Sequence, residues 1–317
     1  MSQKVATPKA YKASLWTRIW KNRMVYTLII PGLIWYLLFA YGPILGLQLA
    51  FKTYKAKLGI WGSPWCGFMN FQNLFIDPDF MRSVWRTLGL NVVRILVEFP
   101  APIIMALMLN EIRTPRYRKV LQTVYTFPHF LSWVIIASVM QNVLAYDGAV
   151  NKIIQMLGGN TINFLGNQQG LWPLLFISSI WKGAGWSSII YLAAISGIDM
   201  DQYEAAEIDG ASRWQRLVHI TLPNLQQIIV VMFILQVGSV MSMGFDQLFN
   251  LDNAALGKAT ETLDMYIYRF TFKQTSDFGF STAVSLFRSV VNCVLLIIAD
   301  RGSKAIGGSG LIGGSDD

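Results

Sequence analysis

The sequence predicts an all-α membrane protein with about six membrane-spanning helices. Hydrophobic residues make up 53% of its 317 positions and charged residues only 14%, which is too apolar for a soluble domain of this length. Long apolar windows are the second observation, because a helical span needs roughly 20 mostly apolar residues. None of the windows alternates apolar and polar residues as a barrel strand does. They cover residues 24–51, 84–110, 120–145, 171–197, 222–245 and 280–300.

Proline occurs inside the first four of these windows. It removes a backbone hydrogen bond, but neighbouring helices can satisfy the freed carbonyl groups within a membrane protein. We therefore expect several kinked spans. The prolines concerned are Pro31, Pro43, Pro100, Pro102, Pro128 and Pro173.

Basic residues predict which ends of the spans face the cytoplasm. Residues 1–23 contain several lysines and arginines and no acid, and residues 111–119 are also rich in arginine. Both segments should be cytoplasmic under the positive-inside rule, and with six spans residues 198–221 are then cytoplasmic too. This gives three regions, which are a basic cytoplasmic N-terminus (1–23), a membrane domain (24–300) and a flexible, Gly/Ser-rich cytoplasmic tail (301–317).

The outer loops have different expected structures. Residues 52–83 should lie folded on the membrane, and residues 147–170 contain a short amphipathic run that favours an interfacial helix. Residues 246–279 form the longest outer loop and are rich in polar groups and tyrosines. This last loop would face whatever delivers a substrate.

Charge and motifs exclude several functions. The net charge of +8 comes mainly from the two basic inner segments, so membrane lipid and topology explain it and no nucleic-acid partner is expected. Nucleotide binding is not expected either, because no Gly-x-x-x-x-Gly-Lys-[Ser/Thr] motif occurs. We find no Ser/His/Asp grouping, metal-ligand cluster or paired-acid motif in the spans. The chain is therefore expected to be no enzyme, with neither catalytic nor metal-binding residues.

The polar segment 198–221 predicts two short helices joined by a turn. Asp201 can cap a first helix with Glu204 at its third position, and Ser212 can cap a second with Gln215. Gly210 falls between them, where a left-handed residue is needed. Pro223 falls at the start of the next long helix, where its missing N–H costs nothing.

The same segment carries a recognisable pattern. It reads Glu204-Ala205-Ala206, three residues, Gly210, nine residues, and then Ile220-Thr221-Leu222-Pro223. This pattern resembles the EAA loop of ATP-binding-cassette (ABC) importer permeases, in which the loop is the coupling helix that sits in a cleft of the ATPase. The resemblance implies the type I ABC importer permease fold, with the coupling loop at 198–221. The ATPase-coupling residues it implies are Glu204, Ala205, Ala206, Glu207, Asp209, Gly210, Arg213, Trp214, Arg216, Ile220, Leu222 and Pro223.

Three further segments resemble carbohydrate permeases, especially those for complex oligosaccharides. They are Phe127–Trp133, Ile180–Gly183 and Gly244–Leu251. The resemblance implies a bacterial inner-membrane protein that works with a second, different permease, two ATP-binding subunits and an extracytoplasmic solute-binding protein. ATP and Mg²⁺ would be bound by the ATPase subunits, so this chain itself is expected to hold no cofactor.

Ionisable residues inside the spans suggest a substrate passage, because such groups usually face a cavity or a partner. At ~1.5 Å per residue, Arg94, Lys182 and Arg288 lie roughly 12 to 17 Å deep in the membrane. Glu98 is four residues from Arg94 and could neutralise it. Aromatic faces stack on sugar rings, whereas amides and cations bind hydroxyls and carboxylates. The predicted pathway residues are Arg94, Trp133, Lys182, Trp186, Gln236, Asp246, Arg288 and Asn292.

This belt of side chains favours an acidic oligosaccharide, such as a uronate oligomer, moved by alternating access. Neutral oligosaccharides and polyol phosphates remain alternative substrates. The same side chains could instead serve only as contacts between helices. A non-transporting membrane scaffold is the alternative from another functional class.

Overall fold

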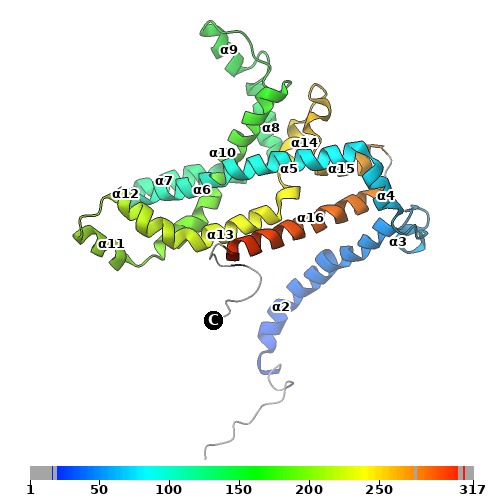
Figure 1. Ribbon diagram of the computed structural model, residues 1–317, viewed down its shortest axis with the longest axis horizontal. Coiled ribbons are helices and arrows are strands. Elements are labelled where there is room, and N and C mark those ends of the chain that lie inside the picture. The colour runs from blue at the N-terminus through cyan, green and yellow to red at the C-terminus, as the bar shows by residue number, and fades with distance from the viewer. Residues whose placement is uncertain (1–15, 17–19, 275–276, 306–309, 311–317) are drawn as a thin grey trace, which may run out of the picture.

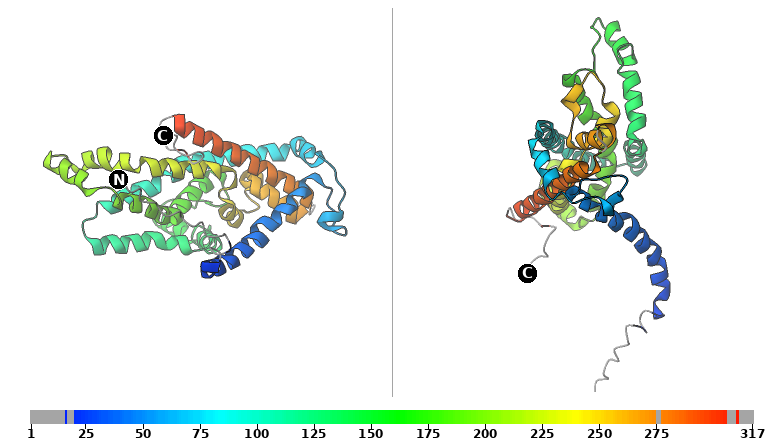
Figure 2. Two further views of the ribbon diagram at one scale, coloured as in Figure 1. Left: turned by 90° about the horizontal axis from the view of Figure 1, so that it is seen from below. Right: turned by 90° about the vertical axis from the view of Figure 1, so that its right-hand side faces the viewer.

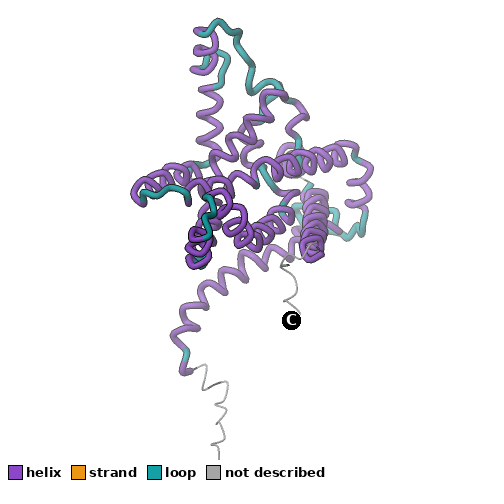
Figure 3. Tube along the Cα trace, turned by 60° about the vertical axis from the view of Figure 1, so that its left-hand side comes forward, coloured by secondary structure: helices purple, strands orange, loops and turns teal. Residues whose placement is uncertain are grey.

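The described part of the chain is helical. The computed structural model describes residues 16, 20–274, 277–305 and 310. Among these residues there is no β-strand, and Lys52 and Trp65 form an isolated bridge (Figure 3). Most of the predictions for the basic N-terminus (1–15 and 17–19) and for the tail (306–309 and 311–317) lie outside the described residues.

Within the described residues, four helical stretches are long and apolar enough to cross a membrane. They are Arg23–Phe51, Pro78–Asn110, Arg213–Gly238 and Phe278–Ala305, and a bent pair, Pro115–Phe130 with Trp133–Val143, passes the same test together. The first consists of α2 (Arg23–Tyr36), η1 (Leu37–Tyr41) and η2 (Gly42–Phe51), and the second of α5 (Pro78–Glu98) and α6 (Pro100–Asn110). The third consists of α12 (Arg213–Arg216), η4 (Leu217–Thr221) and α13 (Leu222–Gly238), and the fourth is α16 (Phe278–Ala305).

The predicted window 171–197 forms α10 (Gln168–Ser196). With 29 residues this helix is long enough for a span, but it is not among the apolar candidates. Its middle carries Lys182 between serines and glycines. Helix α10 packs against α6 and against α7 (Pro115–Thr126), and it is the central helix of the bundle.

The predicted span over 120–145 is broken next to Pro128, one of the positions where a kink was expected. The chain bends by 95° between η3 (Phe127–Phe130) and α8 (Trp133–Val143). Pro128 lies in η3, as the expected kink required, and the side chain of Ser132 accepts from the Ile135 N–H to begin a new helix. The Lys182 Nζ donates to the carbonyl oxygens of His129 and Leu131, both at 2.7 Å. The carbonyl groups freed at the break are thus partly satisfied from another helix.

The fifth predicted span also ends earlier than expected, at Gly238 instead of 245. A short turn, η5 (Val240–Ser242), follows it. The Asn91 side chain donates to the Val240 carbonyl at 2.6 Å, and the Met241 N–H donates to Asn292 Oδ1 at 3.0 Å. These side chains from α5 and α16 replace the hydrogen bonds that a continuing helix would have made.

The predicted outer loop 246–279 is a folded helical segment. It contains α14 (Phe245–Leu251), η6 (Gly257–Thr260), α15 (Leu263–Tyr268) and η7 (Arg269–Gln274). Leu248, Leu251, Leu263 and Tyr266 are at most 2% exposed, so the segment contributes to the core. The expected loop is therefore folded, because its apolar residues pack on α5, α8 and α16.

The other outer segments are short helices. Residues 52–83 contain α3 (Gly59–Gly62) and α4 (Met69–Ile76), and α4 packs on η2 and α16. The amphipathic run in 147–170 forms α9 (Ala149–Met156), as predicted. Met156 and Leu157 at its end are more than 80% exposed.

The molecule is elongated, with distinct ends (Figure 1). Helices α11 (Met200–Ile208) and α12 lie at one end, near the end of α6 and the start of α7, and α3 and α4 lie at the other. Helix α2 leaves the body on one side, whereas α8 and α9 project on the opposite side (Figure 2). No residue of α2 is buried within the chain. A helix that is apolar all round and unburied needs lipid or another chain to cover it.

Candidate functional site: the coupling hairpin and the membrane pathway

The segment 198–221 folds as the predicted pair of helices, here called the coupling hairpin. Helix α11 ends in a left-handed turn, with Gly210 at φ +77°. The Ala211 N–H donates to the Ala206 carbonyl at 2.9 Å and the Gly210 N–H to the Glu207 carbonyl at 3.1 Å. These two bonds satisfy the last carbonyl groups of α11, and the left-handed backbone explains why glycine occupies this position.

One of the two predicted caps is correct. Ser212 and Gln215 form a full capping box at α12, with the Ser212 N–H donating to Gln215 Oε1 at 2.7 Å. The first helix is capped by Asp199, which accepts from the Asp201 N–H, and the predicted cap at Asp201 is wrong. Asp201 lies in the first turn instead, where its negative charge favours the helix dipole. Pro223 lies at the start of α13, as expected.

Three side-chain contacts hold the hairpin to itself and to the bundle. Arg216 Nη1 lies 3.0 Å from Glu207 Oε2 and joins α12 to α11. Hydroxyl groups of Tyr203 and Thr221 are 2.9 Å apart, and Asn224 Nδ2 donates to Gln202 Oε1 at 3.1 Å. These contacts join α11 to α12 and to the start of α13.

The tip of the hairpin exposes the predicted coupling residues. Glu204, Ala205, Asp209, Gly210 and Arg213 are exposed and Ala206 is half-buried, while Trp214 is 72% exposed. Ile220 and Leu222 are half-buried at the base. Ile208, which the sequence reasoning missed, is 87% exposed. The sequence did hold a signal for it, because an apolar isoleucine between two acidic residues at a predicted helix end favours a protein contact.

Lys182 lies at the bend between η3 and α8. Besides its two backbone carbonyl partners, its Nζ lies 5.8 Å from the centre of the Trp133 ring. The ring of Trp186 stacks on His129 at 4.5 Å with an interplanar angle of 5°. The structure therefore brings together Lys182, Trp133 and Trp186 from the predicted pathway. Among the described residues, no carboxylate lies within ion-pair distance of Lys182.

Arg94 and Glu98 form the predicted ion pair, with Nε and Oε1 3.4 Å apart. Arg94 also donates to Gln247 Oε1 at 2.8 Å, and Glu98 accepts from the Ser179 hydroxyl at 2.8 Å. Arg94 is only 3% exposed, so it does not line an open passage in this conformation. Gln247 is fully buried and was missed, because its partners lie in helices distant in sequence.

The remaining pathway residues lie in separate places. Gln236 lines a cavity of about 140 Å³ together with Glu98 and Ser179. Arg288 forms an ion pair with Asp264. Asn292 accepts from the Met241 N–H and donates to the Ser242 hydroxyl, and Asp246 is exposed at the start of α14. Two of the three expected cations thus have carboxylate partners within the chain.

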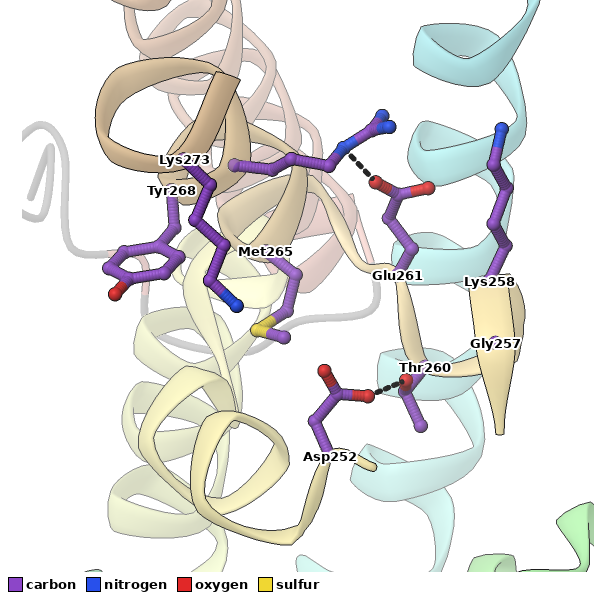
Figure 4. A pocket seen from close by; sticks show the side chains of 9 residues that line it. Asp252, Gly257, Lys258, Thr260, Glu261, Met265, Tyr268 and Lys273 are labelled. Atoms are coloured by element: carbon purple, nitrogen blue, oxygen red, sulfur yellow. Dashed lines mark hydrogen bonds and ion pairs between the residues drawn. The ribbon is translucent and has the colours of Figure 1, made fainter. Parts of the chain in front are cut away.

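A second polar cavity, of about 160 Å³, lies in the helical segment that replaces the expected outer loop (Figure 4). The Arg269 Nε lies 2.7 Å from Glu261 Oε1, and the Thr260 hydroxyl donates to Asp252 at 2.7 Å. Burial raises the pKa of the Glu261 carboxyl, and the nearby Arg269 charge partly offsets this. Lys258 pairs with Asp79 and ties the segment to α5.

The chain is similar in sequence to known membrane transport proteins. Residues 98–306 match the family described as binding-protein-dependent transport system inner membrane component. Over 304 residues the chain is 40% identical to the polygalacturonan/rhamnogalacturonan transport system permease protein YteP of Bacillus subtilis (strain 168), covering 96% of this chain and 94% of that protein.

Two solved structures share the fold. One is the crystal structure of a bacterial ABC transporter involved in the import of the acidic polysaccharide alginate, which is 36% identical with a TM-score of 0.83 and covers 92% of this chain and 99% of that chain. The other is a bacterial alginate ABC transporter in complex with an alginate pentasaccharide-bound periplasmic protein, which is again 36% identical with a TM-score of 0.83. It covers 94% of this chain and 99% of that chain.

Proposed function

This chain belongs to the family of binding-protein-dependent transport system inner membrane components, and from that premise we propose that it imports acidic oligosaccharides of the uronate type. It is a sugar-importing ABC permease with the type I permease fold, and it is a transport protein rather than an enzyme. The observation that carries the proposal is that a 40% identical relative is named for polygalacturonan and a structural neighbour for alginate, described as an acidic polysaccharide.

The chemistry at the bend supports an acidic substrate. A lysine ammonium group has three N–H donors, and Lys182 uses two of them on the carbonyl oxygens of His129 and Leu131. The third donor and the positive charge are available for a carboxylate. Trp133 and Trp186 offer aromatic faces beside it, on which the apolar face of a sugar ring can stack.

The other predicted pathway residues would supply hydrogen-bonding groups and ion pairs. Gln236 and Asn292 supply amides for the hydroxyl groups of the sugar. Asp246 is an exposed acceptor at the start of α14. Arg288 with Asp264, and Arg94 with Glu98, place neutralised ion pairs around the passage. Lys182 is therefore the residue assigned to the substrate carboxylate.

Energy for transport is proposed to come from other subunits. Two ATPase subunits would bind ATP and Mg²⁺, and this chain would hold no cofactor. The tip of the coupling hairpin, where Ile208 is exposed, would dock in an ATPase cleft and move α13 as the ATPases close. We place the hairpin and both termini of the chain in the cytoplasm, in accord with the basic segments 1–23 and 111–119.

The remaining partners follow from the exposed surfaces. A second, different permease would cover α2, of which no residue is buried within this chain. An extracytoplasmic solute-binding protein would deliver the oligosaccharide at the end that carries α3, α4 and α15, opposite the coupling hairpin. A periplasmic protein is present in the alginate transporter complex.

ATP-driven uptake by the complete transporter in proteoliposomes tests the proposal. Radiolabelled oligogalacturonate is supplied with its solute-binding protein, and uptake is measured against unlabelled competitors. Oligogalacturonate should compete, whereas its methyl ester, which has the same sugar but no charge, should compete poorly. Equal competition by the ester or by a neutral oligosaccharide would refute the acidic assignment. Absence of ATP-dependent uptake of any sugar would favour a scaffold.

A further inference from the structure

The end of the bundle that carries the coupling hairpin has two adjoining cavities of opposite character. The first, of about 680 Å³, is polar and lies between the α6–α7 connection and the coupling hairpin. The second, of about 490 Å³, is apolar and lies between α6 and the second helix of the hairpin with the start of α13. Glu111 and Leu217 line both cavities, so a single elongated molecule can extend from one into the other.

The polar cavity has an excess of positive charge. Four arginines and three glutamates line it. Arg216 and Glu207 neutralise each other, with Nη1 and Oε2 3.0 Å apart. The other three arginines have no carboxylate within ion-pair distance among the described residues. They are Arg113 and Arg213, which are exposed, and Arg118, which is half-buried. Arginine side chains bind phosphate oxygens with paired hydrogen bonds.

The apolar cavity runs along α6, which is the second part of a candidate span. One side is the face of α6 between Pro100 and Met108, and the other contains Trp214 and Leu222. Ile104 is 56% exposed and Met108 67% exposed, so the chain itself leaves this face uncovered. Such a surface suits an acyl chain.

We propose that the two cavities together bind one anionic phospholipid, with its phosphate among Arg113, Arg118 and Arg213 and an acyl chain along α6. A polar pocket at the end of a span, continuous with an apolar groove on that span, matches the shape of a lipid with its head and tail. The excess of one arginine over the unpaired glutamates favours an anionic headgroup over a zwitterionic one. Hydroxyl groups of a phosphatidylglycerol head can donate to Glu111 or Glu204.

The site would join the coupling hairpin to the bundle. Arg118 belongs to α7 and Arg213 to α12, and among the described residues no side-chain hydrogen bond or ion pair joins these two elements. One phosphate between the two arginines would therefore bridge them. The lipid would then brace the hairpin from the membrane side while its tip remains free for another protein.

Native mass spectrometry of the complete transporter in detergent, titrated with phosphatidylglycerol, tests the site. Each basic residue near a charged lipid surface contributes about 1 kcal/mol, which is about fivefold in affinity. The variant Arg118→Gln/Arg213→Gln should therefore bind the lipid more weakly by roughly tenfold or more. The control Arg116→Gln removes an exposed arginine of α7 that lines neither cavity and should leave affinity unchanged. Equal affinity in the double variant and wild type would overturn the proposal.

A measurement on the wild type covers the case in which the double variant fails to assemble. Phosphatidylglycerol with a photoreactive group in its acyl chain should crosslink to residues 100–108. Crosslinks absent from that range, or moved to an ATPase subunit that fills the groove, would rule the site out. Millimolar inorganic phosphate should leave the crosslink intact. Full displacement by phosphate would identify a free-anion site and also contradict the lipid assignment.

Discussion

At the scale of single residues, the three cations predicted within the spans are stabilised in three different ways. Arg94 pairs with Glu98 one helical turn away and with Gln247. Arg288 pairs with Asp264 in α15. Lys182 instead donates to two backbone carbonyl oxygens, which satisfy its hydrogen bonds without cancelling its charge. The uncompensated charge makes Lys182 the strongest candidate for a substrate contact.

Substitution of Lys182 tests this assignment. Lys182→Met should lower uptake of acidic oligosaccharide by roughly tenfold or more, because a hydrogen bond to a charged group contributes about 1.5–3 kcal/mol. The amount of assembled complex should fall less than uptake, and Lys119→Met, at an exposed site on α7, serves as the control. Arg288→Met should instead lower assembly and uptake together, because it leaves Asp264 without its cation. An equal loss of assembled complex and of uptake in Lys182→Met would show that Lys182 is a contact between helices only.

Arg94 should matter for stability. Arg94→Met leaves the Glu98 carboxylate, whose side chain is 14% exposed, without its cation, and breaking a mostly buried pair in this way costs up to about 3–5 kcal/mol. The matched control is Arg82→Met, which removes the i,i+3 partner of Asp79. The Arg82 side chain is 56% exposed, so its loss should cost at most about 1 kcal/mol. Thermal unfolding of the detergent-solubilised complex measures both. Equal losses would contradict the structural role of Arg94.

At the scale of elements, the packing of α7 on α10 depends on a close approach between their backbones. A Cβ atom at Gly185 would lie 2.1 Å from the Tyr125 carbonyl oxygen, so only glycine allows this packing. The bend after α7 and the position of Lys182 both depend on it, because Lys182 reaches the broken helix from α10. A glycine in a helix of the membrane domain is here a packing requirement.

Gly185→Ala should therefore destabilise the protein by about 1–3 kcal/mol, as overpacking does in other cores. Gly183→Ala is the control from the same helix, because nothing lies within 4 Å of a Cβ at that position. Thermal unfolding of the two variants should separate them. If Gly183→Ala destabilised as much as Gly185→Ala, helix propensity or lipid contact would explain the effect instead.

At the scale of the whole molecule, the coupling hairpin and the outer helical segment occupy opposite ends of the bundle (Figure 1). The hairpin is joined to α13 through Gln202 and Asn224, and α13 packs against α16. A displacement of the hairpin can thus reach the helices that surround Gln236 and Asn292. The exposed α2 and the exposed hairpin tip are surfaces that lipid or other chains can cover.

Gly210 tests the coupling role of the hairpin. Alanine at φ +77° costs about 1–2 kcal/mol, which lowers the population of the native turn by roughly fivefold or more. In proteoliposomes, Gly210→Ala should reduce uptake per ATP hydrolysed while hydrolysis continues. Gly89→Ala, in α5 with ordinary helical backbone and open space, should leave the ratio unchanged. An unchanged ratio in Gly210→Ala would argue against this hairpin as the coupling element.

The sequence by itself determined the features that depend on residues within about four positions of one another. The helical class, the position of the coupling hairpin, the turn at Gly210, the Ser212–Gln215 capping box and the Arg94–Glu98 pair all follow from local spacing. Only the tertiary structure decided where the third span breaks, how residues 246–279 fold, and which side chains surround Lys182. These depend on contacts such as Arg94 with Gln247, 153 residues apart, or Lys182 with His129, 53 residues apart, for which local backbone preferences carry no information.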